Sequence, residues 1–255
     1  MIPIDDRGLT LGDGLFETIL ARNGALVLLD EHLERLARGC VALGLPGPDV
    51  EEARRLCKAA ARTVSGRAAV RLTLTAGSGG RGLGRPARPA PRLFAAAAPA
   101  PKPSAPAVLV TSTVRRNEGS PGSRLKTLSY LDNVLAREEA RAAGADEALM
   151  LNNAGEIACA AAANIFWLKE GRLFTPALEC GALDGIMRAQ VLAAAASLGL
   201  SVAVVRVSRL SASDADAIFL TSSLIGLRAV GTLNGVQQPT QKGFRQLSDR
   251  LERHF

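Results

Sequence analysis

The chain has 255 residues, a formal net charge of +7 and an apolar fraction of 47%. This length is enough to bury a core in one large domain or two modest ones. The sequence has no uninterrupted apolar run of about 18 residues and no basic stretch followed by an apolar one at its N-terminus, so neither a membrane span nor a secretory leader is expected. We therefore expect a cytoplasmic protein.

The excess of positive charge does not predict nucleic-acid binding, because the arginines are dispersed and aromatic residues make up only 4% of the chain. The arginines could instead favour an anionic substrate. The cysteines Cys40, Cys57, Cys159 and Cys180 show no metal-ligand spacing, and the chain has only two histidines. We expect reduced thiols and no metal site.

The first part of the chain mixes helical and strand patterns. Residues 30–43 repeat apolar side chains at helical spacing, whereas residues 68–76 alternate apolar and polar side chains as a strand does. Residues 86–106 are rich in proline and alanine, and the run PRLFAAAAPA predicts a strand between prolines. The domain junction is predicted just after it, giving an N-terminal α/β domain over 1–104 and a C-terminal domain over 107–255.

The second part of the chain repeats the same mixture. A strand is predicted over 107–114, a helix over 130–143, a strand pair over 147–152 and 156–160, and a helix over 186–198. The expected fold class is therefore α/β (α+β), with two domains.

Lys126 is the first candidate for chemistry. The chain contains 5 lysines against 26 arginines, and only a lysine amine can form a Schiff base or act as a base after desolvation. Most lysines are nevertheless solvated surface charges, so this residue carries little weight without its neighbours.

The run Leu183-Asp-Gly-Ile-Met-Arg188 is typical of a helix start that could bind a phosphate. Gly185 lets the backbone approach closely, and the N–H groups of Ile186 and Met187 would face the anion. An ordinary helix start is the alternative interpretation.

Several longer motifs carry a family resemblance, and they extend over nearly the whole chain. They are DDRGLTLGDGLFETIL, LLDEHLERL, VRLTLTAGSGGRG, LKTLSYLDNVLAREEA, GADEALMLNNAGEI, AANIFW, TPALECGALDGIMR and FLTSSLIGLRAV. In this order they resemble the fold-type IV pyridoxal-phosphate enzymes, a family that includes branched-chain and D-amino-acid aminotransferases and aminodeoxychorismate lyases. The resemblance implies a homodimer and a cofactor, pyridoxal 5′-phosphate, between a smaller N-terminal and a larger C-terminal domain. It also implies an opening edge strand before DDRG that a chain starting here would lack.

The resemblance assigns roles to individual residues. Lys126 matches the lysine that binds the cofactor covalently. Arg35, in EHLERL, and Ser223, in LTSSLIG, match positions that bind its phosphate together with Gly185, Ile186 and Met187. Tyr130 matches a tyrosine that lies against the phenolic oxygen of the ring in some members, although a buried aromatic is the commoner explanation of such a residue.

Cys159 is the main departure from the family pattern. Five residues before the asparagine of AANIFW, relatives carry a glutamate that bonds the pyridine nitrogen, and counting back from Asn164 gives Cys159. Strand alternation places Glu156 on the opposite face, so we expect no substitution by that carboxylate. A thiol lacks the negative charge that stabilises a protonated ring, which favours elimination over transamination, or else a degraded site.

Two arginines match substrate positions. Arg81, in GSGGRG, resembles a loop arginine that binds a substrate carboxylate, and Arg116 lies in a run similar to lyase sequences; each could also be an ordinary surface charge. The expected function is aminodeoxychorismate lyase, acting on a small anionic amino substrate. The alternatives are a D-amino-acid or branched-chain aminotransferase and a non-catalytic protein of the same fold. Phe16 and Glu17 receive no chemical role.

Overall fold

The structure is a computed structural model that describes residues 2–212, 214–239 and 242–252. The chain forms two compact units: unit 1 is Met1–Lys102 with Leu125–Tyr130, and unit 2 is Pro103–Arg124 with Leu131–Phe255. The segment that carries Lys126 therefore folds with unit 1. The domain boundary predicted from the sequence, between residues 104 and 107, places this segment in the C-terminal domain instead. Among the described residues, no helix is long and apolar enough to cross a membrane.

Unit 1 is built on an antiparallel sheet in the order β2-β1-β3-β4. Its strands are β1 (Gly14–Arg22), β2 (Ala25–Leu26), β3 (Arg67–Thr75) and β4 (Arg92–Pro99). β1 pairs with β3 along its whole length, from Gly14 opposite Thr75 to Arg22 opposite Arg67. The short helix α1 (Arg7–Leu11) precedes this sheet.

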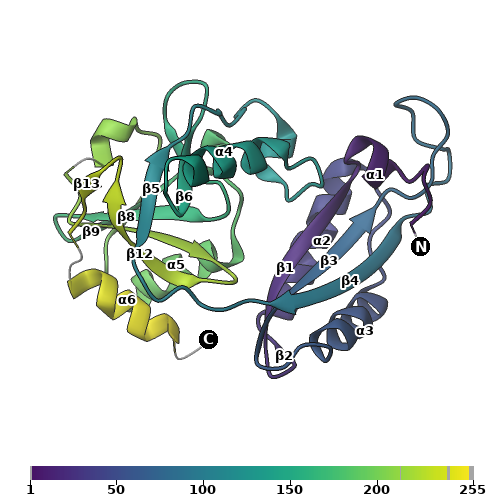
Figure 1. Cartoon of the computed structure of the whole chain (residues 1–255), viewed down its shortest axis with the longest axis horizontal. Helices are drawn as coiled ribbons and strands as arrows, with labels where there is room; N and C mark the ends of the chain where they lie inside the picture. Colours follow the sequence, from purple (N-terminus) through teal and green to yellow (C-terminus); the bar gives the residue numbers. More distant parts are fainter. Residues whose placement is uncertain (1, 213, 240–241, 253–255) are drawn as a thin grey trace. The chain divides into compact units, whose positions relative to one another are not determined.

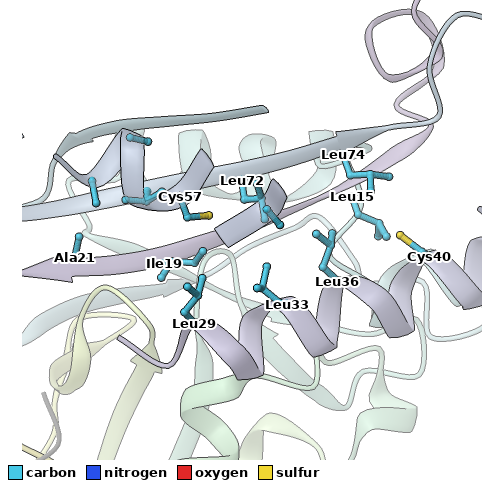
Figure 2. Close-up of a cluster of buried hydrophobic side chains, with 14 of the residues drawn as sticks. Leu15, Ile19, Ala21, Leu29, Leu33, Leu36, Cys40, Cys57, Leu72 and Leu74 are labelled. Atoms are coloured by element: carbon cyan, nitrogen blue, oxygen red, sulfur yellow. The ribbon is translucent and has the colours of Figure 1, made fainter. Parts of the chain in front are cut away.

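One face of this sheet is covered by α2 (Leu29–Leu43) and α3 (Val50–Ala61) (Figure 1). α2 presents an apolar stripe to the sheet, and its C-cap is Gly44, whose φ of 64° a glycine adopts at little cost. The buried cluster between these layers, drawn in Figure 2, consists mainly of aliphatic side chains from β1, β3 and the two helices. Side chains at Leu15 and Ile19 point into this core, and strand alternation sends Phe16 to the opposite face.

Unit 2 contains a larger mixed sheet in the order β10-β9-β8-β11-β12-β5-β6-β7, with β13 paired to β12. The strands are β5 (Ala107–Thr111), β6 (Glu147–Leu151), β7 (Ile157–Ala160), β8 (Asn164–Lys169), β9 (Arg172–Pro176), β10 (Val202–Val205), β11 (Ala217–Ser222), β12 (Gly226–Leu233) and β13 (Val236–Gln237). Its helices are α4 (Leu131–Ala142), α5 (Ile186–Ser197) and α6 (Lys242–Glu252), and short 3-10 turns lie at Pro121–Arg124, Leu178–Cys180 and Arg209–Ala212.

The mixed α and β character predicted from the sequence is confirmed in both units. The helices expected over 30–43, 130–143 and 186–198 are α2, α4 and α5, and the strands expected over 68–76, 91–100, 147–152 and 156–160 are β3, β4, β6 and β7. The strand expected over 107–114 is shorter in the structure, where β5 ends at Thr111. Beyond it, the Ser112 hydroxyl and the Thr113 backbone N–H donate to the Glu139 carboxylate.

Candidate active site

Lys126 lies beside the first residues of β1 within unit 1. Its carbonyl oxygen accepts a hydrogen bond from the Phe16 backbone N–H at 2.9 Å, and the Leu128 N–H donates to the Gly14 carbonyl at 2.9 Å. These bonds use the part of the β1 edge that the short β2 does not cover. Gly14 has no room for a side chain, because a Cβ there would lie 2.3 Å from the Leu74 carbonyl oxygen. The backbone of the lysine segment is therefore fixed against the sheet.

The Lys126 amine is surrounded by aromatic rings and cations. Its Nζ lies 4.2 Å from the centroid of the Phe16 ring and 5.0 Å from that of Tyr130. Desolvation by burial, reinforced by the positive charges of Arg35 and Arg71, lowers the Lys126 pKa from 10.5 to about 8 although Glu17 opposes the shift. At pH 7 roughly a tenth of this amine is therefore uncharged, far more than for a lysine with the ordinary pKa, and the neutral form is the one that a nucleophile or a general base requires.

Tyr130 packs against Phe16, as an edge-on aromatic pair with 5.1 Å between ring centroids. This contact holds both rings beside the lysine amine. The structure shows this aromatic packing. The contact of Tyr130 with a cofactor oxygen stays a prediction.

Arg35, on α2, forms a two-point ion pair with Glu17. Its Nε lies 2.8 Å from Oε1 of Glu17 and its Nη2 lies 2.6 Å from Oε2. The same carboxylate contacts Nδ1 of His32 at 2.7 Å, and the Glu17 side chain is 1% exposed. Burial alone would raise the Glu17 pKa, but the hydrogen bonds from Arg35 and His32 outweigh it and lower the pKa to about 2. Glu17 is thus a permanent anion that fixes the plane of the Arg35 guanidinium.

Arg71 is a candidate that sequence reasoning missed. It extends from β3 opposite Thr18, and its guanidinium carbon lies 3.7 Å from the Phe16 ring centroid. The residue is exposed, and partial burial of the guanidinium lowers its pKa. It is therefore a cation near the lysine amine that could bind a substrate carboxylate. Strand alternation in VRLTLT indicated its face, but only the β1–β3 register places it beside Phe16 and thus near Lys126.

Cys159 is buried on β7 of unit 2, opposite Met150 of β6. Its neighbours are mostly small apolar residues, including Ala136 and Ala140 of α4. Desolvation by burial raises the pKa of its thiol and outweighs the opposite effect of the Arg116 charge, and the nearby Glu147 carboxylate adds a smaller upward effect. Cys159 is therefore a neutral thiol near pH 7.

The argument that strand alternation places Glu156 opposite Cys159 does not hold, because the ladder contains a bulge. Cys159 pairs with Met150, but the next pair joins Leu151 to Ile157, so Ala158 is the extra residue. Ala158 and Cys159 accordingly contact the same cluster, which also includes Cys180. The Sγ of Cys180 lies 3.7 Å from Glu156, yet the Glu156 carboxylate is bonded to Asn152 and Arg206. The hydrogen bonds from Asn152 and Arg206 therefore determine where the Glu156 carboxylate lies.

The start of α5 in unit 2 has the features of a phosphate site. Gly185 is the N-cap and supplies no side chain to the helix N–H groups, while Ile186 and Met187 form the buried first turn. A Cβ at Gly185 would lie 1.9 Å from Oδ1 of Asn164, whose amide donates to the Leu183 carbonyl at 2.9 Å. Unpaired first-turn N–H groups and the helix dipole favour an anion here.

Arg188 adds a buried cation to this turn. Its Nη2 donates to the Pro176 carbonyl at 3.3 Å and its Nη1 lies 3.8 Å from Asp184. The Nε of Arg188 is buried and has no hydrogen-bond partner within the described part of the chain. An unpaired buried donor at a helix N-terminus fits an anionic ligand such as the cofactor phosphate. Ser223 follows the end of β11 and is half-buried.

The two proposed substrate arginines differ in their surroundings. Arg116 is 8% exposed and donates to the Gly181 carbonyl, to Oδ1 of Asn133 and to the Ser123 carbonyl. Each nitrogen of this guanidinium thus has a protein acceptor, and Arg116 ties together three segments of unit 2. Arg81 is exposed in the loop between β3 and β4 of unit 1.

Comparison with known proteins gives a consistent family. The sequence model of the family described as amino-transferase class IV matches residues 14–233. An aminodeoxychorismate lyase from Bacillus subtilis is 28% identical over 93% of this chain and 83% of its own length. A D-alanine aminotransferase from Listeria monocytogenes is 29% identical over 92% and 83%. The crystal structure of 4-amino-4-deoxychorismate lyase from Pseudomonas aeruginosa superposes with a TM-score of 0.89 at 32% identity, over 99% of this chain and 95% of that one.

Proposed function

The chain belongs to the class IV aminotransferase family, whose cofactor is pyridoxal 5′-phosphate, and on that premise we propose that it is an aminodeoxychorismate lyase. The reaction would convert 4-amino-4-deoxychorismate to 4-aminobenzoate and pyruvate. The buried neutral thiol of Cys159 carries this proposal, because a thiol in place of the family's usual glutamate disfavours transamination more than elimination. Relatives with lyase names, such as the Bacillus subtilis protein, support it.

The donor set of the chain fits this cofactor. Lys126 supplies an amine whose pKa is about 8, and the first turn of α5 with the buried Nε of Arg188 supplies donors for a phosphate. Arg35 supplies a cation whose orientation Glu17 fixes. When bound, the cofactor withdraws electrons from the bonds at the α-carbon of the substrate.

Lys126 would transfer the protons in this reaction. In its neutral form the amine accepts the α-proton of the substrate, and as an ammonium group it returns a proton to the departing three-carbon unit. The Phe16 and Tyr130 rings around it, at 4.2 and 5.0 Å, limit the access of water to the amine. Arg71 would bind one of the two substrate carboxylates next to this amine.

The neutral thiol of Cys159 would favour elimination over transamination. A carboxylate at the ring nitrogen stabilises its protonated form and hence negative charge on the ring, whereas a thiol whose pKa is raised does not. Transamination would depend on that stabilisation more strongly than elimination, because in elimination the electrons leave with the breaking bond and the product becomes aromatic.

An aminotransferase acting on D-amino or branched-chain amino acids is the second candidate. The Listeria monocytogenes relative supports it, and the lysine and the helix start are common to both reactions. A non-catalytic protein of the same fold is a weaker candidate, because the Lys126 environment retains the lowered pKa that chemistry needs. No such environment is required for folding alone.

The first experiment follows the cofactor and then the products. An absorbance spectrum with pyridoxal phosphate, borohydride reduction and peptide mapping should place the reduced adduct on Lys126. The protein should then release 4-aminobenzoate and pyruvate in equal amounts from aminodeoxychorismate. Exchange of amino groups between amino acids and keto acids, with no release of 4-aminobenzoate, would establish an aminotransferase instead. The absence of any adduct on Lys126 would overturn both the lyase and the aminotransferase hypotheses.

The variant Cys159→Glu tests the electronic argument directly. We expect transamination to rise by about tenfold or more and lyase turnover to fall, since one pKa unit of ring protonation corresponds to about 1.4 kcal/mol. Cys159→Ser is the matched control, because it changes the side chain without adding charge. A rise in lyase turnover with no transamination in Cys159→Glu would show that this account of the cysteine is wrong.

A further inference from the structure

The connection between β3 and β4 is much longer than a hairpin needs. The sixteen residues between Thr75 and Arg92 contain no helix or strand, and five of them are glycine and three proline. Hairpin loops usually take about two to five residues, and unstructured loops beyond about 12–15 residues are commonly functional or disordered. A loop of this composition needs outside contacts to keep one conformation.

The first part of this loop is attached to the first residue of α1 and to a residue that precedes the helix. The backbone N–H of Arg7 donates to the Gly77 carbonyl at 2.9 Å, and the Ser78 hydroxyl contacts the Asp5 carboxylate at 3.0 Å. Gly77 has a φ of 81°, and a Cβ there would lie 2.0 Å from the Ala90 carbonyl oxygen. Only glycine fits this close approach between the two ends of the loop.

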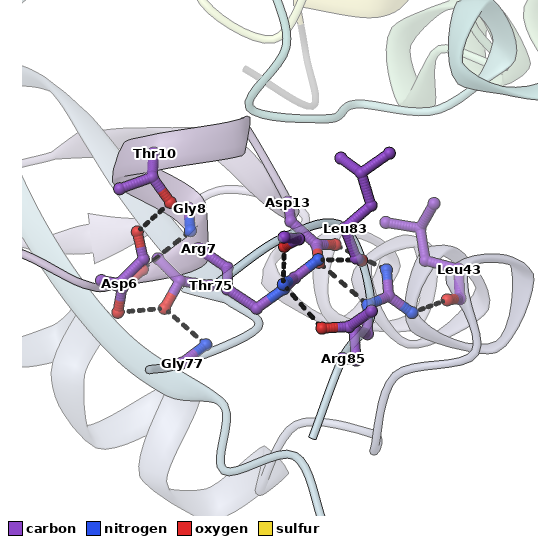
Figure 3. A network of polar contacts seen from close by, with 12 residues as sticks. Asp6, Arg7, Gly8, Thr10, Asp13, Leu43, Thr75, Gly77, Leu83 and Arg85 are labelled. Carbon is purple, nitrogen blue, oxygen red and sulfur yellow. Dashed lines mark hydrogen bonds and ion pairs between the residues drawn. The ribbon is translucent and has the colours of Figure 1, made fainter. Parts of the chain in front are cut away.

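The Arg7 side chain holds the later part of the loop (Figure 3). Its guanidinium donates to the carbonyl oxygens of three consecutive residues: Nη1 to Gly82 at 3.3 Å and to Gly84 at 3.1 Å, and Nη2 to Leu83 at 2.8 Å. Arg7 is 4% exposed although it is charged. Gly79 makes room for it, because a Cβ at that position would lie 2.5 Å from the Arg7 Cδ.

Asp13 completes the arrangement as the counter-ion of two arginines. Its carboxylate accepts from Arg7 Nε at 2.9 Å and from Arg85 at 2.9 and 2.5 Å. The hydrogen bond from Arg85 is the main cause that lowers the Asp13 pKa. Arg85 also donates to the Leu43 carbonyl at the end of α2. We call Arg7, Asp13 and Arg85 the loop clamp.

Two residues, Gly80 and Arg81, lie between the attachments at Gly79 and Gly82. The Gly79 N–H contacts the Asp5 carbonyl at 3.4 Å on one side, and Arg7 holds Gly82 on the other. The exposed guanidinium of Arg81 therefore extends from a span only two residues long. Fixing the ends of so short a span removes most of the conformational freedom of its backbone.

From these contacts we propose that Arg7 is a positioning residue: through the loop clamp it preorganises the β3–β4 loop and presents the Arg81 guanidinium to a carboxylate of the substrate. The part that concerns substrate rests on the proposed function. The clamp itself is a property of unit 1 alone. It gives a role to Arg7 of the DDRG motif and to Asp13 of the GDG motif, neither of which the cofactor chemistry uses.

Limited trypsin digestion tests the clamp without any assay of activity. Arg85 and Arg88 are each followed by proline, so Arg81–Gly82 is the bond within residues 76–91 that trypsin can cut. In Arg7→Met we expect this bond to be cut about tenfold faster or more, because proteolysis follows the population of the open loop. Arg55→Met is the matched control, since Arg55 is an exposed helix residue paired with Glu52.

Further variants keep the test decisive. If Arg7→Met does not fold, Arg85→Met removes the partly exposed partner of Asp13 and should accelerate the same cleavage. Arg7→Lys should not restore protection, because an ammonium group lacks the planar fork that reaches three carbonyls and a carboxylate. Unchanged cleavage in a folded Arg7→Met or Arg85→Met protein, or full protection in Arg7→Lys, would overturn the clamp.

Kinetics separates the clamp from the proposed function. Arg81→Gln should raise KM for the dicarboxylate substrate, Arg7→Met should raise KM with kcat within about threefold, and the double variant should be no worse than Arg81→Gln. If Arg81→Gln leaves KM unchanged while Arg7→Met still exposes the loop, the clamp stands and the substrate role of Arg81 is wrong. Additive effects on KM would show that Arg7 acts independently of Arg81.

Discussion

Phe16 and Glu17, neighbours on β1, serve opposite faces of the unit 1 sheet. Phe16 contacts the Lys126 amine, whereas Glu17 points toward α2 and binds Arg35. No pattern in the sequence assigns a chemical role to either residue, because the glycines before them already account for the motif as a turn. Their alternation along one strand is what links the lysine segment to the arginine on α2.

Glu17 should make the stability of the protein dependent on pH. Its folded-state pKa of about 2 lies below the ordinary value of 4.5. The contribution, about 3 kcal/mol, is fully present above pH 4.5 and is lost as the pH falls toward 2. The free energy of unfolding, measured by urea titration from pH 7 to pH 3, should therefore fall more steeply for the native protein than for Glu17→Gln.

The same variant should also be less stable at neutral pH. Removing one member of a buried ion pair costs about 3–5 kcal/mol, because the charge of Arg35 stays largely buried without its counter-ion. Glu51→Gln is the control, since Glu51 is exposed and paired only at 3.6 Å with Arg54. If the free energy of unfolding changed with pH in the same way in the native protein and in Glu17→Gln, the assignment of the low pKa to this carboxylate would be contradicted.

At the scale of elements, the start of α5 depends on a single glycine. The sequence indicated that Gly185 allows close approach of the backbone, and the structure shows the neighbour that makes this necessary, Asn164 at the start of β8. The asparagine of AANIFW therefore holds the Leu183 carbonyl and shapes the turn before the helix. Two motifs that are far apart in the sequence form one local structure.

Gly185→Ala should damage this turn. The added Cβ would lie 1.9 Å from the Asn164 side chain, and relief of such a contact costs about 1–3 kcal/mol. We expect the Kd for pyridoxal phosphate, measured by quenching of protein fluorescence, to rise by about tenfold or more. Gly47→Ala is the control, because a Cβ there meets nothing within 4 Å. Equal affinity in both variants would place the phosphate elsewhere.

Secondary structure was largely predictable, but the β6–β7 pair shows where prediction fails. Both strands were found from apolar runs bounded by turn residues, and the turn itself lies between Asn152 and Glu156. The bulge at Ala158 left no signal in the sequence, since alanine is compatible with either register. One extra residue changes which side chains share a face, so the inference about Glu156 failed there.

At the scale of the whole molecule, each unit has its own buried core, and α4 of unit 2 leaves apolar side chains uncovered. Leu131, Val134 and Leu135 are 66%, 52% and 48% exposed. They lie within two turns of one helix, and exposed apolar clusters of this kind commonly mark an interface. The homodimer implied by the family resemblance would cover them.

Light scattering during size-exclusion chromatography should therefore give about twice the chain mass of 26.6 kDa. Leu131→Glu combined with Leu135→Glu should shift the protein toward the monomer, because a charge in an apolar interface is costly. Val236→Glu is the control, since that exposed residue lies on β13. A monomeric native protein, or a dimer unaffected by the α4 changes, would exclude this helix as the interface.

The sequence by itself determined the family, the cofactor, the main helices and strands, and the candidates Lys126, Arg35 and Gly185. These follow from local patterns and from motifs in a fixed order. The tertiary structure decided which residues act on them: the β1–β3 register brings Arg71 beside Phe16, α2 packing pairs Arg35 with Glu17, and the loop clamp joins Arg7 to residues 82–84. Such pairings depend on packing between segments that are far apart in the sequence, and no local sequence pattern specifies which of these segments meet.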